Sequence, residues 1–462
     1  MRQHPAKTLA LAVCGCTALW SVQAAAQSSD SQTLQQMQDQ IQQLQKQVQE
    51  MKAEQQNQQA AATTTTAQPA QSSGPTKKLT IGGGVVTEYQ KKNYGGNNAG
   101  AGDLILDYFD LNVAGQYGKL TYAADYRWSK VNFKSGQYLH NAWAAYDFGP
   151  NDTSQIKGGM FQVPFGNLPY GYQSFWGNLN FYAGFADNQA AGVGYKYENN
   201  GWRFDLDAFK NQGLGQQSTY GANPDQSNET TTTQSIDTSG STPKIVTTTS
   251  TVSGARLVNG GNARLGRTIK LNGDNTLNLS VAGRGGQLEY TNASGDTSYG
   301  TRWAGTLAAE ADLGNWVLQG QFVDYKYNIP NDIAGGNTEA VPMEDYGYRY
   351  LMPAKGQLYS ASIGRTFPVS NMGPISSFEI YNDYGYLHSG YGNYDNVGNR
   401  IGDVQQNTTG IAMFAGPVDV WAEWVEAKNG AMAFTGPGND GNWHGRFNLT
   451  AAFYFDGDLI KK

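Results

Sequence analysis

The sequence predicts an all-β fold, a 16-stranded antiparallel transmembrane β-barrel preceded by a short periplasmic α-helical coiled coil. Three observations lead to this prediction. Most of the chain alternates apolar and polar residues with a period of two, as strands with two different faces do. Short and long connections alternate between these segments, as turns and loops do in outer-membrane barrels. The 462 residues include 58 glycines and 28 tyrosines, whereas only 15% are charged.

The composition argues against other classes of protein. A hydrophobic fraction of 39% is too low for a helical membrane protein, which needs several apolar runs of about 20 residues. The net charge of −6 disfavours nucleic acid as a partner. Both cysteines, Cys14 and Cys16, lie near the N-terminus. The rest of the chain therefore offers no disulfide and no thiolate site.

Residues 1–26 have the pattern of a signal peptide. Arg2 and Lys7 are basic, residues 8–22 are apolar, and residues 24–26 are three alanines before Gln27. This order is typical of a secretory signal with a small-residue cleavage site. A lipoprotein signal at Cys14 or Cys16 is the weaker alternative. The sequence therefore predicts export, with the Gram-negative outer membrane as the destination of the barrel.

Residues 30–54 predict an oligomerising coiled coil in the periplasm. Apolar residues recur there at spacings of three and four, which is the a/d seam of a heptad pattern. A single helix of this length is marginally stable in water, and a homotrimer is the expected assembly. A disordered Gln-rich stretch is the alternative. Residues 55–77 read as a flexible linker to a barrel over 78–462. The seam consists of Leu34, Met37, Ile41, Leu44, Val48 and Met51.

Sixteen strands are predicted after the linker. An even number places both ends of the barrel on the short-turn, periplasmic side. A soluble β-sandwich is the alternative, but small residues combined with aromatic residues near strand ends favour the membrane. The predicted segments are 79–90, 103–116, 119–131, 138–148, 154–164, 190–199, 201–210, 262–271, 276–290, 300–313, 315–328, 355–367, 375–387, 405–415, 417–428 and 442–455.

Charged residues on the polar face of these strands are predicted to line the pore. Separated charges across a narrow lumen create a transverse field that orients charged or dipolar solutes. The alternative is that they pair locally along the wall without effect on selectivity. The predicted pore-lining residues are Asp125, Arg127, Arg203, Asp205, Asp207, Arg264, Arg284, Arg302, Glu379, Asp383, Glu423 and Arg446.

Two long connections differ sharply in composition. Loop 165–189 is too aromatic for exposure to water, and we expect it to fold into the lumen as a constriction. Packing against a neighbouring subunit is the competing interpretation. Loop 211–261 is rich in Thr, Ser, Asn and Gly, and is expected to be mobile and extracellular. The constriction residues are Phe165, Tyr170, Tyr172, Phe175, Trp176 and Phe181.

Catalytic motifs are not evident. The histidines after the signal, His140, His388 and His444, are far apart in sequence, and no nucleophile elbow or P-loop occurs. The sequence therefore predicts no enzyme, no cofactor and no metal. A barrel hydrolase that uses His140 or Ser174 is kept as a minor alternative.

Several short motifs resemble one family. Residues 157–166 (KGGMFQVPFG), followed by Phe175-Trp176 and by residues 192–195 (GVGY), are similar to the constriction region of the phosphate-selective porin O/P superfamily. Residues 381–384 (YNDY) resemble a late strand of the same group. The N-terminal heptads and linker are similar to those of DcaP-like porins within it. The resemblance implies a 16-stranded trimeric porin that passes small hydrophilic, often anionic, solutes.

The sequence departs from this family in two places. Loop 165–189 contains no Lys or Arg, whereas phosphate-selective members carry basic residues at the constriction. The chain also continues past Phe455, where such barrels usually end. We therefore expect a passive channel for small hydrophilic solutes, anions or sugars, in contact with outer-membrane lipid and lipopolysaccharide. The alternative is an envelope-tethering or adhesive barrel without an open pore.

Overall fold

The computed structural model describes twelve stretches of the chain after residue 75. They are 76–94, 100–129, 136–212, 223–224, 229–237, 244–252, 254–291, 296–330, 340–345, 348–389, 403–429 and 441–461. All of them belong to one compact unit, which includes Pro75–Lys462. The predicted signal peptide and coiled coil, and residues 55–75 of the predicted linker, lie outside the described residues.

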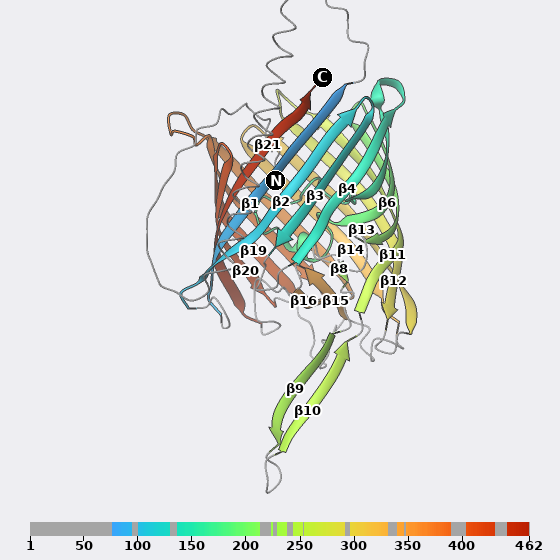
Figure 1. The fold of residues 1–462 in the computed structure, drawn as a ribbon, viewed down its shortest axis with the longest axis vertical. Helices are drawn as coiled ribbons and strands as arrows, with labels where there is room; N and C mark the ends of the chain where they lie inside the picture. Colours follow the sequence, from blue (N-terminus) through green and yellow to red (C-terminus); the bar gives the residue numbers. More distant parts are fainter. Residues whose placement is uncertain are drawn as a thin grey trace, which may run out of the picture. The chain divides into compact units, whose positions relative to one another are not determined.

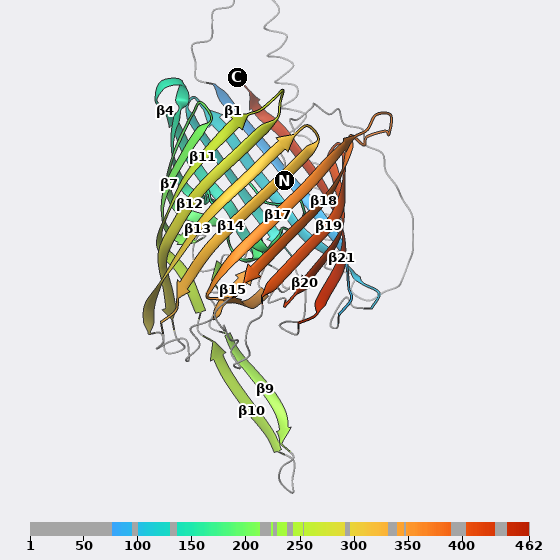
Figure 2. The ribbon, with the colours of Figure 1, turned by 180° about the vertical axis from the view of Figure 1, so that it is seen from behind.

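Sixteen antiparallel strands form a closed barrel (Figures 1 and 2). Each strand pairs with its neighbours in the sheet order, and β21 pairs with β1 to close the ring. The strands are β1 (Lys77–Lys92), β2 (Asp103–Tyr117), β3 (Leu120–Ser129), β4 (Gly136–Phe148), β5 (Ser154–Gln162), β6 (Gln189–Asn199), β7 (Trp202–Gln212), β11 (Gly254–Lys270), β12 (Thr276–Thr291), β13 (Thr297–Leu313), β14 (Trp316–Asn328), β17 (Lys355–Pro368), β18 (Ser377–His388), β19 (Val404–Ala415), β20 (Val418–Lys428) and β21 (Trp443–Lys461).

The prediction of a closed 16-stranded antiparallel barrel is confirmed, and every predicted segment overlaps one of these strands. The end of the chain differs from the expectation. Residues beyond Phe455 continue β21, where Gly457 pairs with Ile81 and Ile460 with Leu79 of β1. The extra residues are part of the seam that closes the barrel. In Figure 1 this end of β21 and the start of β1 lie at the same rim, opposite the β15–β16 rim.

The strands expose apolar residues on one face and bury polar residues on the other. On β13, Trp303 and Leu307 are 45% and 59% exposed, whereas Arg302 and Thr306 are 5% and 3% exposed. Successive side chains on a strand point to opposite faces, so a regular alternation produces two chemically different surfaces. The burial pattern of β7 alternates in the same way. The polar face of the barrel is thus the covered one.

The long connections contain structure that the sequence did not predict. Within 211–261, β8 (Asn223–Pro224) precedes a hairpin of β9 (Glu229–Asp237) and β10 (Lys244–Val252), and β11 begins eight residues before the predicted strand. Residues 329–354 include β15 (Ala340–Asp345) and β16 (Tyr348–Pro353), which join β8 in a three-stranded sheet. No strand was predicted in these two connections, because strand pairing satisfies polar backbone groups without an apolar pattern.

Two short helical elements complete the described part of the chain. A 3-10 turn, η2 (Pro150–Asp152), joins β4 to β5, and α2 (Leu179–Tyr182) is a single turn of helix in the connection between β5 and β6. None of the described helices has the length and the apolar character that a bilayer-spanning helix requires.

Candidate functional site

Most residues of the connection between β5 and β6, residues 163–188, are buried, and we call this connection the L5 segment. The segment ends at residue 188, whereas the predicted loop ends at residue 189, because Gln189 already belongs to β6. Phe165, Trp176 and Phe181 are at most 5% exposed, and Tyr170, Tyr172 and Phe175 are half-buried. Its rings contact one another in sequence, with centroid distances of 5.6 Å for Tyr170–Tyr172 and 6.3 Å for Tyr172–Phe181. Five of the six predicted constriction residues belong to or pack against one buried apolar cluster, and Tyr170 contacts this cluster through Tyr172.

Backbone N–H groups of the L5 segment donate to carboxylates on distant strands. Ser174 N donates to Asp383 Oδ2 on β18 over 2.8 Å, and Phe175 N donates to Glu423 Oε1 on β20 over 2.8 Å. Gln173 N also donates to Asp383. Two predicted pore-lining acids thus hold the backbone of the L5 segment.

Arginines from other strands hold the carbonyl oxygens of the same segment. Arg264 Nε of β11 donates to Gly166 O over 3.2 Å, and Arg284 of β12 donates to Gly184 O. The Arg284 guanidinium also lies 4.5 Å from the centroid of the Phe165 ring. Arg446 of β21 lies 4.8 Å from the centroid of Trp176. Carboxylates therefore bind donors of the segment, and guanidiniums bind its acceptors and rings.

The helix α2 presses an apolar side chain against the barrel wall. Asn178 caps the helix, because its Oδ1 accepts from Asn180 N over 2.9 Å. Leu179 is fully buried and lies against Gly385 of β18. A Cβ atom at Gly385 would lie 2.5 Å from the Leu179 Cβ, so only glycine allows this approach. The wall and the segment are fitted to each other at this point.

The sheet of β15 and β16 extends the apolar contact. Tyr350 Oη donates to Tyr182 O over 2.6 Å, and Met343 and Met352 are fully buried in the same cluster as Leu179. Burial raises the pKa of the Tyr172 and Tyr182 phenols well above the ordinary value, so both phenols stay protonated at neutral pH. The cluster includes buried residues of β11 to β14 and of β17 to β19. One side of the barrel is therefore packed with apolar groups.

The remaining predicted pore-lining residues mostly pair along the wall. Arg127 forms an ion pair of 2.8 Å with Asp125, and His140 Nδ1 lies 2.9 Å from the same carboxylate. Arg203 forms a 2.9 Å ion pair with Asp205. Separately, Arg302 donates to Tyr327 Oη over 3.3 Å, and Glu379 lies on the buried face of β18. These contacts fit the alternative of local pairing for part of the set.

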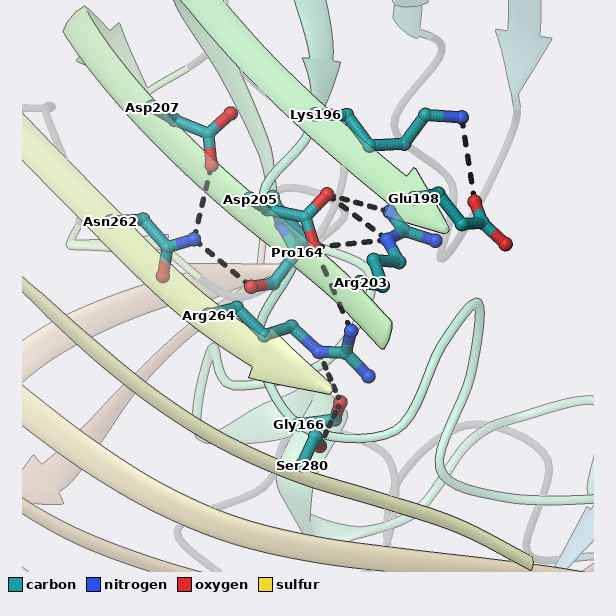
Figure 3. A network of polar contacts seen from close by, with 10 residues as sticks. All are labelled: Pro164, Gly166, Lys196, Glu198, Arg203, Asp205, Asp207, Asn262, Arg264 and Ser280. Atoms are coloured by element: carbon teal, nitrogen blue, oxygen red, sulfur yellow. Dashed lines mark hydrogen bonds and ion pairs between the residues drawn. The ribbon is translucent and has the colours of Figure 1, made fainter. Parts of the chain in front are cut away.

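A cavity of about 300 Å³ lies between β4 to β7 and the start of the L5 segment. Its lining combines three carboxylates, from Asp187, Asp205 and Asp207, with three cationic side chains. Figure 3 shows part of this wall, where Asp207 accepts from Asn262 and Arg264 joins Asp205 to Gly166. The cationic residues are Lys157, Lys196 and Arg203.

Sequence reasoning missed several of these residues. Lys157 stands before Gly158 and Gly159, whose lack of side chains hides the alternation of β5. Asn262 and Gln321 are uncharged and were not considered, yet Asn262 donates to Pro164 O and Gln321 accepts from Asn167 N. A search for amides on the polar face, in addition to charges, would have found them.

The described residues do not bring a catalytic set together. Ser174 Oγ donates to Gly177 O over 3.0 Å, whereas His140 is paired with Asp125. These are separate networks. In the described part of the chain, no three His, Cys, Asp or Glu residues are placed to hold a metal ion.

Comparisons with known proteins return structures but no sequence relatives. No family model matches the chain, and no curated protein matches it. The chain resembles the outer membrane channel DcaP of Acinetobacter baumannii, with 12% identity, a TM-score of 0.48, and coverage of 84% of this chain and 100% of that one. It also resembles OprB of Pseudomonas putida, with 10% identity, a TM-score of 0.48, and coverage of 82% and 94%.

A third similar structure is an anion-selective porin from Comamonas acidovorans. It shares 15% identity, with a TM-score of 0.47 and coverage of 82% of this chain and 100% of that one. Identities and TM-scores this low assign neither a solute nor a selectivity to the present chain.

Proposed function

We propose that this protein is a porin, a passive channel through the outer membrane for small hydrophilic solutes. The observation that carries the proposal is the inverted distribution of residues in a closed barrel. Leu265, Val281 and Leu307 are 45% to 59% exposed, whereas Arg284, Asp383 and Arg446 on the opposite face are at most 4% exposed. An extended apolar outer surface is unfavourable in water and suits lipid. A closed ring leaves no unpaired strand edge in the bilayer.

In this proposal the L5 segment narrows the lumen. Its anchors on β18 and β20 support this role, because these two strands are distant from β5 and β6 in the sheet order. A segment can reach the polar faces of strands around the ring only by crossing the space that they enclose. The charged side chains that line the remaining space would orient solutes as they pass. Transport is driven by the solute gradient and needs no cofactor.

The N-terminal part of the proposal rests on the sequence pattern. Residues 1–26 would direct export, residues 30–54 would assemble three copies in the periplasm, and the linker would connect them to the barrel. The outer surface would contact lipid and lipopolysaccharide.

Conductance in a planar bilayer, with a salt gradient, tests the proposal. Stepwise openings in groups of three are expected from a trimeric channel. Heat-dependent migration on a gel gives an independent check, because a folded barrel trimer should run as a distinct band until it is heated. A folded protein that inserts without conducting would overturn the proposal. That result would favour the tethering alternative, in which the apolar cluster beside β11 to β19 plugs the barrel.

A further inference from the structure

The cavity beside β4 to β7 contains two opposite charges that are close together in the sheet. Lys157 of β5 pairs with Gly194 of β6 in the strand register, and Gly194 pairs with Asp207 of β7. Neighbouring strands are spaced by about 4.8 Å, so the backbones of Lys157 and Asp207 are about 10 Å apart. Both side chains line the same cavity.

Each of the two charges also contacts the strand on its outer side, β4 for Lys157 and β11 for Asp207. The Lys157 ammonium lies 4.4 Å from the centroid of Trp143 on β4. The Asp207 carboxylate accepts from Asn262 Nδ2 on β11 over 3.0 Å (Figure 3). Among the described residues, the ion pairs of this region join Lys196 to Glu198 and both Arg203 and Arg264 to Asp205, and none within 4 Å includes Lys157 or Asp207. Lys157 and Asp207 are therefore a separated pair that a suitable solute can bridge.

Gly194 makes room for two side chains that line the cavity beside Lys157. A Cβ atom at this position would collide with Asp207 Oδ1 and would lie 3.1 Å from the Phe161 ring. A larger residue would displace the carboxylate. The Asp207 carboxylate and the Phe161 ring therefore lie directly over Gly194, and the Lys157 ammonium is 5.7 Å from the centroid of the same ring.

The balance of charges around the gap selects among solutes. An anion attracted by Lys157 and Lys196 is repelled by the carboxylates of Asp205 and Asp207, and a cation meets the opposite arrangement. Coulomb energies at such distances are of the order of 1 to 4 kcal/mol each, so attraction and repulsion nearly offset each other for a singly charged solute. A solute that carries both a positive and a negative charge is attracted at both of its ends.

We infer that this cavity is a subsite for small zwitterions, in which an ammonium and a carboxylate are a few Å apart, as in amino acids. The Lys157 ammonium donates to the solute carboxylate, and the solute ammonium donates to Asp207. Hydrogen bonds of about 2.9 Å at both ends hold the solute inside the cavity. The inference rests on the proposed function, since the solute reaches the cavity from the lumen, and it specifies the class of solute.

Uptake of labelled L-serine and of labelled glycerol into proteoliposomes tests the inference. Serine is the zwitterion, and uncharged glycerol reports whether the channel is open. We expect serine uptake to saturate with concentration and glycerol uptake to rise linearly. In Lys157→Gln and in Asp207→Asn, the serine-to-glycerol ratio should fall at least about fivefold, which corresponds to roughly 1 kcal/mol at one lost contact. The matched control is Lys210→Gln, because Lys210 is exposed and pairs with Asn259 outside the cavity.

Charge derivatives of the solute separate the alternatives. N-acetylserine is an anion and serinamide at pH 6 is a cation, and both should compete with labelled serine more weakly than unlabelled serine does. Equal competition by either derivative, or an unchanged ratio in both variants, would overturn the inference while glycerol uptake leaves the channel proposal intact. If neither serine nor glycerol enters, the proposed function and this inference both fail.

Discussion

The two sides of the barrel interior are built differently. Beside β11 to β19, the L5 segment and the β15–β16 sheet pack Leu179, Tyr182, Met343 and Met352 into a closed apolar cluster. Beside β4 to β7, the same segment leaves a cavity lined by charged and amide side chains. The L5 segment thus has an anchored face on the side of β11 to β19 and an open face, which borders the cavity, on the side of β4 to β7. The comparison indicates that the proposed solute path is eccentric and follows the β4–β7 wall.

The largest effect is expected from removing the segment that separates the two sides. Deletion of residues 168–181 should raise the single-channel conductance by about threefold or more, because a wider lumen carries more ions. The matched control is deletion of residues 229–252, which removes the β9–β10 hairpin. Unchanged conductance in a folded 168–181 deletion, verified by heat-dependent migration, would show that the L5 segment is not the constriction.

A smaller effect should follow from releasing the anchored face. The double variant Asp383→Ala with Glu423→Ala removes the acceptors of the Ser174 and Phe175 N–H groups. Each buried N–H group left without an acceptor costs about 1 to 3 kcal/mol, and the freed segment should make the open-channel current noisy. Thermal unfolding on gels and current noise are the measurements. Glu426→Ala is the control, because its carboxylate accepts from Trp424 Nε1 on the exposed face. Quiet currents and normal stability would mean that other contacts hold the segment.

The fit between Leu179 and the wall can be tested by one methyl group. In Gly385→Ala, the added Cβ collides with the Leu179 Cβ, and overpacking of this kind costs about 1 to 3 kcal/mol. The unfolding temperature should fall. Gly305→Ala serves as the control, since no atom lies within 4 Å of the position of its added Cβ. An equal decrease in both variants would point to β-strand glycine effects in general and not to this contact.

The smallest effect is expected from removing one charge from the cavity that the open face of the L5 segment borders. Lys196 is about one-third exposed and forms a long ion pair of 3.8 Å with Glu198. Lys196→Gln should shift the reversal potential by a few millivolts towards cation preference, with unchanged conductance, because one positive charge is lost from the path. The shift should shrink at high salt, where charges are screened. An unchanged reversal potential at low salt would place the path on the other side of the barrel.

Much of the barrel could be predicted from the sequence because it depends on local patterns. The period of two predicted all sixteen strands, and the alternation of short and long connections indicated that they form an outer-membrane barrel. Strand ends were harder, since β11 and β21 continue through residues without a clear alternation. Their extent depends on partners, as the pairing of Gly457 with Ile81 illustrates.

The sequence by itself determined the closed barrel, its two faces and the aromatic character of the connection after β5. Only the tertiary structure decided what the charges do. Asp383, Glu423, Arg264 and Arg284 were predicted as pore-lining residues, and they hold the backbone of the L5 segment. A strand pattern records which face a residue occupies, but the partner that it meets comes from a segment distant in sequence, and chain folding alone brings the two together.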